Sequence, residues 1–200
     1  MTPEHLVLHG IAIKRHATTE DVSNLVGLDL ITTESIIQTA IKSGRVLEFG
    51  EKVALTPAAT MILNSEYSKL YTPFREKEDF LRAIDEFEKL NNELKSLITS
   101  WQIKKIGGEE VPNDHSDREY DSKIIARLGD LHEKFENIID KLSSDIGRLN
   151  IYKKKLLKAL EKAEDGDIQW VSDAKIESYH TIWFELHEDL LRICGRDREE

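Results

Sequence analysis

Several common features are missing from this 200-residue sequence, and each absence narrows the class of protein. The single cysteine, Cys194, excludes an internal disulfide and any cysteine-based zinc cluster. No apolar run approaches the roughly 20 residues that a transmembrane helix needs. The N-terminal stretch also lacks the basic region and small-residue cleavage site of a secretory signal. We therefore expect a cytoplasmic protein with no membrane contact.

Catalytic signatures are missing as well. The chain has no glycine-rich phosphate loop and no nucleophile elbow, and Cys194 stands close to the chain end on an apolar helix face. Acidic pairs such as Glu109 and Glu110 occur on any acidic surface. We therefore expect that the chain is not an enzyme acting alone, and the sequence implies no cofactor.

The charge is unevenly distributed along a chain whose net charge is −10. Residues 1–75 hold seven Lys and Arg against eight Asp and Glu, whereas the remainder holds 21 against 30. A nearly neutral first part joined to a strongly acidic second part predicts two domains, residues 1–72 and 73–200. The acidic excess argues against a polyanion-binding surface over the whole molecule, although a local one remains open.

Helix signals follow one another closely in the first domain. Apolar residues at helical spacing predict a helix over residues 3–16. A second helix begins after the N-cap Thr18 and ends at Gly27, and a third, "ITTESIIQTAIKSG", ends at Gly44. Two short helices joined through a glycine turn are typical of a helix-turn-helix.

A hairpin and a fourth helix complete this domain. Alternating apolar residues in "RVLEFGEKVALT" predict two strands around Gly50, and Thr56 and Pro57 open a new helix. The order helix, helix, helix, hairpin, helix is that of a winged helix. We therefore predict a mainly α fold, with an N-terminal winged helix-turn-helix.

A winged helix most often binds DNA, with the second helix of the motif in the major groove. The candidate DNA-binding residues lie on that helix and on the hairpin: Thr32, Thr33, Ser35, Gln38, Thr39, Lys42, Arg45 and Lys52. The helix has only one lysine, no arginine and Glu34 near its start, so few cations face phosphate. A module that binds protein, or has a purely structural role, is therefore the alternative. A dimer would double the number of cations.

The second domain is dominated by apolar residues spaced three or four apart. They predict a long helix from about Pro73 to Trp101, a loop over residues 103–116, and helices over 116–142, 146–163 and about 173–193. Four such helices with short connections predict an antiparallel helical bundle that dimerises or binds a partner.

The stretch "SYHTIWFELHEDLL", residues 178–191, is rich in aromatic residues and histidines. Glu177 and His180 have the Glu-x-x-His spacing of carboxylate-bridged di-metal bundles, but no second copy exists, because Gly129 stands three residues before His132. We therefore expect no metal site, and histidines that border an aromatic core or a subunit contact. The predicted effector or partner surface comprises Trp101, Trp170, Tyr179, His180, Trp183 and His187.

Two segments, "FEKLNNELKSLITSWQ" (87–102) and residues 164–200, resemble an uncharacterised, actinobacterial-type family of bacterial proteins. In that family a winged-helix N-terminus, similar to "LHGIAIKRHATTEDVSNLVGLD" here, precedes a helical tail with a SYHTxWFELHEDL signature. Members are usually described as transcriptional regulators. Similar segments accompany phosphoenolpyruvate-utilising enzymes that resemble pyruvate, phosphate dikinase. The resemblance implies no functional residue that carries over.

Two functions follow as hypotheses. The first is a dimeric winged-helix transcriptional regulator that binds double-stranded DNA and holds an effector between its aromatic helices. The second is a non-catalytic accessory subunit of a phosphoenolpyruvate-utilising phosphotransferase, which would act as a protein-interaction module.

Overall fold

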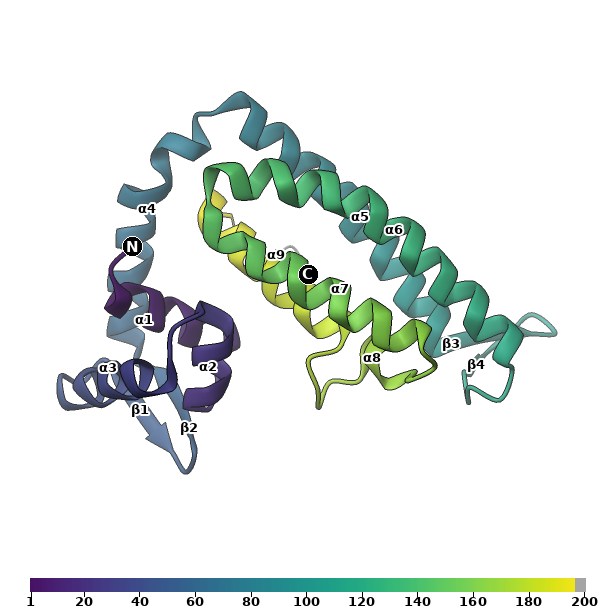
Figure 1. Ribbon diagram of the computed structural model, residues 1–200, viewed down its shortest axis with the longest axis horizontal. Coiled ribbons are helices and arrows are strands. Elements are labelled where there is room, and N and C mark those ends of the chain that lie inside the picture. Colours follow the sequence, from purple (N-terminus) through teal and green to yellow (C-terminus); the bar gives the residue numbers. More distant parts are fainter. Residues whose placement is uncertain (197–200) are drawn as a thin grey trace. The chain divides into compact units, whose positions relative to one another are not determined.

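The computed structural model describes residues 1–196, and it is mainly helical with two small antiparallel sheets (Figure 1). The coarse fold class predicted from the sequence is therefore confirmed. The first elements are α1 (Pro3–Lys14), α2 (Thr19–Val26), α3 (Leu30–Lys42), β1 (Val46–Phe49), β2 (Lys52–Leu55) and α4 (Pro57–Arg75). They are followed by α5 (Glu78–Gln102), β3 (Ile103–Ile106), β4 (Glu109–Pro112), α6 (Arg118–Asp145), the 3-10 helix η1 (Gly147–Leu149), α7 (Asn150–Glu164), α8 (Gln169–Ser172) and α9 (Tyr179–Cys194).

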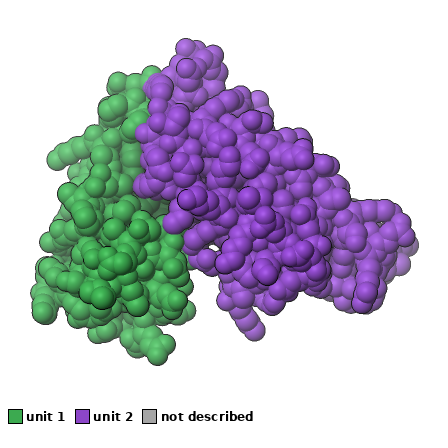
Figure 2. Space-filling view, viewed as in Figure 1, with its two compact units in different colours: residues 1–76, 187–200 green, residues 77–186 purple. Residues whose placement is uncertain are grey.

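The chain divides into two compact units (Figure 2). Unit 1 contains residues 1–76 and the described residues from 187 onward, and unit 2 contains residues 77–186. The predicted domain boundary, between residues 72 and 73, lies four residues before this division. Helix α9 begins in unit 2 and ends in unit 1.

Local signals explain the start of unit 1. The Thr18 hydroxyl accepts a hydrogen bond from the Asp21 N–H at 3.1 Å, and the Asp21 carboxylate accepts one from the Thr18 N–H at 2.9 Å. This capping box begins α2, and Gly27 ends it with a left-handed φ of 71°. The packed core of the unit is apolar, and its most buried side chains include Val7, Ile11, Val22, Ile37 and Leu63.

The β1–β2 hairpin is attached to the segment between α1 and α2. Val46 pairs with Leu55 and Phe49 with Lys52, in the antiparallel register that the Gly50 turn predicts. On its other edge, β2 exchanges backbone hydrogen bonds with Ala17, of 2.8 and 3.2 Å between that residue and Val53. The hairpin and the three preceding helices therefore form one body.

Unit 2 is built on long helices. Helices α5 and α6 pack along each other, and α6 packs against α7 (Figure 1). Apolar residues spaced three or four apart fill the space between them, and the buried side chains include Phe80, Phe87, Leu128, Phe135 and Leu156. No helix of the described residues is long and apolar enough to cross a bilayer.

Three predicted boundaries are wrong. Pro73 lies inside the last turns of α4 and does not open a helix, because a proline near a helix end removes only one backbone hydrogen bond. The predicted loop 103–116 contains the β3–β4 hairpin, whose turn residues Gly107 and Gly108 both have positive φ. The last long helix begins at Tyr179 and not near Asp173, because Ser178 caps it: its hydroxyl accepts from the Thr181 N–H at 3.3 Å.

Candidate functional site

The residues predicted to contact DNA lie on α3 and the β1–β2 hairpin. Ser35, Thr39, Lys42 and Lys52 are exposed, and Thr32, Gln38 and Arg45 are half-buried. Thr33 is fully buried, and its hydroxyl donates to the Asp29 carbonyl at 2.9 Å. The prediction for Thr33 is therefore wrong: the side chain hydrogen-bonds inside the first turn of α3 and does not reach a ligand.

Some of the predicted DNA-binding side chains form hydrogen bonds or ion pairs with acidic residues of unit 1. The Gln38 amide donates to Glu34 at 3.0 Å, and the Thr19 hydroxyl donates to the other oxygen of that carboxylate at 2.8 Å. Arg45 forms a 2.7 Å ion pair with Glu4. Gln38 and Arg45, two of the groups best suited to bases and phosphates, are therefore bonded within unit 1.

An apolar hollow adjoins the same surface. Ile31 is 84% exposed and Leu30 is 52% exposed, although both are large apolar side chains. They line a hollow of about 740 Å³ together with Thr18, Thr19, Ser35 and three carboxylates, Glu20, Glu34 and Glu51. We call this feature the acid-bordered hollow. Exposed apolar side chains rimmed by charged residues are typical of protein interaction sites.

The predicted effector or partner surface is largely core. Trp101, Tyr179 and Trp183 are buried, so they offer no accessible face, and that part of the prediction is wrong. The Trp183 ring stacks on Phe87 with centroids 4.9 Å apart, and its Nε1 donates to the Asn91 side chain at 3.1 Å. A helix face rich in aromatic residues packs against its own neighbours, because burial of these rings stabilises the folded unit.

The remaining residues of that predicted set differ in burial and in the unit to which they belong. Trp170 and His180 are half-buried, whereas His187 is buried and belongs to unit 1. Lys158 lies over the Trp170 ring, 5.9 Å from its centroid. Glu177 forms a 2.7 Å ion pair with Lys155. In residues 1–196 no group of three or more His, Cys, Asp and Glu side chains is arranged to hold a metal ion.

A buried His–Tyr pair accompanies the aromatic core of unit 2. The hydroxyl of Tyr179 lies 3.1 Å from Nδ1 of His132. Burial lowers the pKa of His132, an effect that Glu136 opposes and Lys153 reinforces. Burial also raises the pKa of Tyr179. Both side chains are therefore held neutral, and the phenol donates to an unprotonated imidazole nitrogen.

Sequence reasoning missed a cluster around His115. Asn113 is buried, and its amide donates to the Trp101 carbonyl and to Asp121 Oδ1, both at 2.9 Å. The Asn113 carbonyl oxygen accepts the backbone N–H of His115 at 3.1 Å. The His115 ring lies 4.4 Å from the Trp101 ring, centroid to centroid. The polar run "NDHSD" just before a helix was the available signal, but its placement in a loop hid it.

These hydrogen bonds determine the tautomer of His115. Both protons of the Asn113 amide are used, and His115 Nδ1 lies 3.0 Å from the second oxygen of Asp121. Nδ1 therefore carries the proton that this carboxylate accepts, and Nε2 of the neutral ring is an acceptor. His115 also has a left-handed φ of 57°, a conformation that side-chain-bearing residues adopt rarely. The ring is held in one orientation from several sides.

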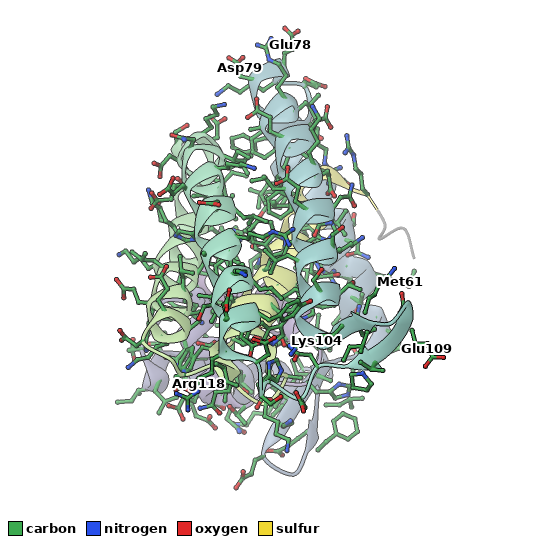
Figure 3. All side chains as sticks on the ribbon, turned by 90° about the vertical axis from the view of Figure 1, so that its right-hand side faces the viewer. Met61, Glu78, Asp79, Lys104, Glu109 and Arg118 are labelled. Carbon is green, nitrogen blue, oxygen red and sulfur yellow. The ribbon has the colours of Figure 1, made fainter. Side chains whose placement is uncertain are left out.

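A cavity of about 640 Å³ opens beside this ring within unit 2. Its polar lining consists of Ser122, His115, Asp121, Glu164 and Arg118, which Figure 3 labels at the start of α6. The apolar lining comes from α6, α7 and the residues that follow α7: Ile125, Ala126, Ala163 and Ile168. A cavity of this size, with apolar walls and a few convergent polar groups, is typical of a small-molecule site.

Family models, curated proteins and solved structures contain no match to this chain. The resemblance described above therefore stays a prediction, and function must be inferred from the two surfaces themselves.

Proposed function

We propose that the chain is a protein-interaction module, in which a winged helix formed by unit 1 docks on a basic amphipathic segment of a partner protein. The order α1, α2, α3, hairpin, α4, with Ala17 paired to β2, supports the winged-helix assignment. The observation that carries the proposal is the acid-bordered hollow, where Ile31 of α3 is apolar and 84% exposed.

Burial of the apolar residues supplies the driving force. Full burial of one isoleucine or leucine side chain stabilises an interface by roughly 1.5–3 kcal/mol. Ile31 and Leu30 expose 84% and 52% of their surface, so together they offer about 3 kcal/mol to a partner that covers them. A hydrated phosphate buries no apolar surface against these side chains, so they add no binding free energy for DNA.

The charges around the hollow select the partner. Glu20, Glu34 and Glu51 form no ion pair with a lysine or arginine of residues 1–196. Three carboxylates around an apolar centre complement a helix or strand that carries leucine-like residues flanked by lysine or arginine. The same carboxylates repel a phosphate backbone.

A DNA-binding regulator is the second candidate, favoured by the order of the elements and by the exposed Lys42 and Lys52. With few cations available for phosphate, such binding would depend on a dimer, whose existence light scattering would establish. For the protein-interaction reading, the family resemblance suggests a phosphoenolpyruvate-utilising phosphotransferase as partner.

A polarisation titration separates the two candidates. The probes are a labelled helical peptide of leucine and lysine, the same peptide with glutamate in place of lysine, and a labelled DNA duplex. We expect the lysine peptide to bind most tightly and Ile31→Ser to weaken its binding about tenfold. The control is Met61→Ser, which removes a 74% exposed apolar side chain of α4 and leaves the hollow intact.

Other outcomes have definite meanings. Equal affinity for the lysine and glutamate peptides would show that the three carboxylates do not select a basic partner. Binding of the duplex that is lost in Lys42→Gln and unchanged in Ile31→Ser would establish the DNA-binding candidate in its place.

A further inference from the structure

The cavity beside His115 has no role in the docking proposed above, because it lies wholly in unit 2. Its lining contains an imidazole nitrogen, a guanidinium, an apolar wall and the carboxylate of Glu164 at the end of α7. The chemistry of these groups defines the class of molecule that fits.

The imidazole supplies a hydrogen-bond acceptor. Asp121 accepts the Nδ1 proton of His115, so the lone pair of Nε2 remains for a donor. Among the described residues no hydrogen bond to Nε2 is formed. A hydroxyl group of the ligand is the matching donor.

The guanidinium of Arg118 supplies the positive charge. The acidic side chains next to it in the sequence are already bonded: Asp114 to Ser116, Asp117 to the Tyr120 N–H, and Glu119 to Lys123. Glu164 is a further carboxylate of the cavity lining. Arg118 forms no ion pair with any of the residues 1–196. A carboxylate of the ligand is the matching group, since guanidinium binds carboxylates through two parallel hydrogen bonds.

The apolar wall receives the remainder of the ligand. Ile125, Ala126 and Ile168 line the cavity beyond the two polar groups. Burial against them stabilises a hydrocarbon substituent and discriminates against fully polar acids.

We propose that this cavity binds a small hydroxy acid that carries an apolar substituent. The hydroxyl donates to His115 Nε2, the carboxylate pairs with Arg118, and the substituent lies against Ile125 and Ile168. Asp121 and Asn113 are positioning residues, because they hold the imidazole in the tautomer that accepts the hydroxyl proton.

Titration calorimetry on the full chain tests the assignment with three probes. Mandelate has the hydroxyl, the carboxylate and a phenyl ring. Phenylacetate lacks the hydroxyl, and 1-phenyl-1,2-ethanediol lacks the carboxylate. We expect mandelate to bind about tenfold more tightly than either of the others, since each loses one hydrogen-bonded group.

Two variants assign the groups separately. In His115→Asn, which suits the left-handed backbone, mandelate and phenylacetate should bind equally. In Arg118→Met, mandelate and the diol should bind equally. Arg127→Met is the matched control, because it removes an exposed arginine of α6 that does not line the cavity, and it should bind all three probes as the unmodified chain does.

The inference fails if mandelate gives no saturable heat up to about 10 mM. It fails equally if mandelate binds with the same affinity to the unmodified chain, His115→Asn and Arg118→Met. Neither result bears on the docking of unit 1, whose variants lie in α3 and α4.

Discussion

Replacement of Asp189 by alanine should destabilise unit 1 far more than the loss of an ordinary surface charge. Asp189 is fully buried, and its Oδ1 lies 3.3 Å from Nε2 of His9, which is also buried. The other ring nitrogen, Nδ1, lies 2.6 Å from the hydroxyl of Tyr67. The phenol donates to Nδ1, so the proton on Nε2 faces the carboxylate.

The expected magnitude follows from burial. Removing one partner of a buried charged pair costs roughly 3–5 kcal/mol, whereas leaving a neutral buried donor unsatisfied costs about 1–3 kcal/mol. The 3.3 Å distance between His9 Nε2 and Asp189 Oδ1 is long for a charge-assisted hydrogen bond, so the lower end of the range for a charged pair applies. We therefore expect about 3 kcal/mol for Asp189→Ala and about 1 kcal/mol for Tyr67→Phe, which removes one hydrogen bond.

Urea denaturation followed by two probes measures this loss. All three tryptophans lie in unit 2, so their fluorescence reports on that unit, whereas far-ultraviolet circular dichroism reports on both. In Asp189→Ala, part of the circular-dichroism signal should be lost at a lower urea concentration than in the unmodified chain. The urea midpoint measured by tryptophan fluorescence should not change.

A surface pair provides the control. Glu119→Ala, which breaks a largely exposed pair with Lys123, should cost no more than about 0.5 kcal/mol. The reasoning would be refuted if Asp189→Ala cost no more than Glu119→Ala, or if Asp189→Ala and His9→Ala were additive in a double-mutant cycle, since a coupled pair is non-additive.

Two further predictions concern single side chains. Because burial holds the pKa of His132 below its ordinary value of 6.5, its contribution to stability should be complete above about pH 6.5 and decline as the pH falls. His132→Asn keeps an acceptor for the Tyr179 hydroxyl. The urea midpoint of this variant should fall less steeply below about pH 6.5 than that of the unmodified chain. An equally steep fall in both proteins would contradict the prediction. Gly10→Ala should destabilise unit 1 by about 1–3 kcal/mol despite the better helix propensity of alanine, because the new Cβ would lie 2.7 Å from a methyl of Val26. Adding Val26→Ala to Gly10→Ala should recover most of the lost stability, measured as the urea midpoint. If the midpoint does not rise, the clash with Val26 is not the cause of the destabilisation.

Most helix positions were predictable because the signals are local. The capping box of Thr18 and Asp21 and the left-handed Gly27 involve residues a few positions apart, and the apolar periodicity of α5 and α6 is visible in any short window. The β3–β4 hairpin was missed because the glycine pair was interpreted as the end of ordered structure. The same pair is a two-residue hairpin turn when residues on both sides can pair.

The exposure and bonding of the predicted site residues were harder to predict from the sequence than the helices. Thr33 and Gln38 have side chains suited to DNA, yet one is buried and the other is bonded to Glu34. The sequence predicts Tyr179 and Trp183 on a binding surface, but both are buried. A sequence does not specify which apolar helix faces pack against other helices of the same unit. Ile31 shows the converse, an apolar residue that the fold leaves exposed.

By itself, the sequence determined the positions of most helices, that the fold is mainly helical, and where charge accumulates along the chain, since these depend on near neighbours and composition. Tertiary structure alone decided that Ile31 faces solvent among three acids, that Asp189 meets His9, and that Asp121 orients His115 at a cavity. The physical reason is the same in each case: exposure, ion pairing and tautomer are set by atoms brought together across space, and residues far apart in the chain supply them.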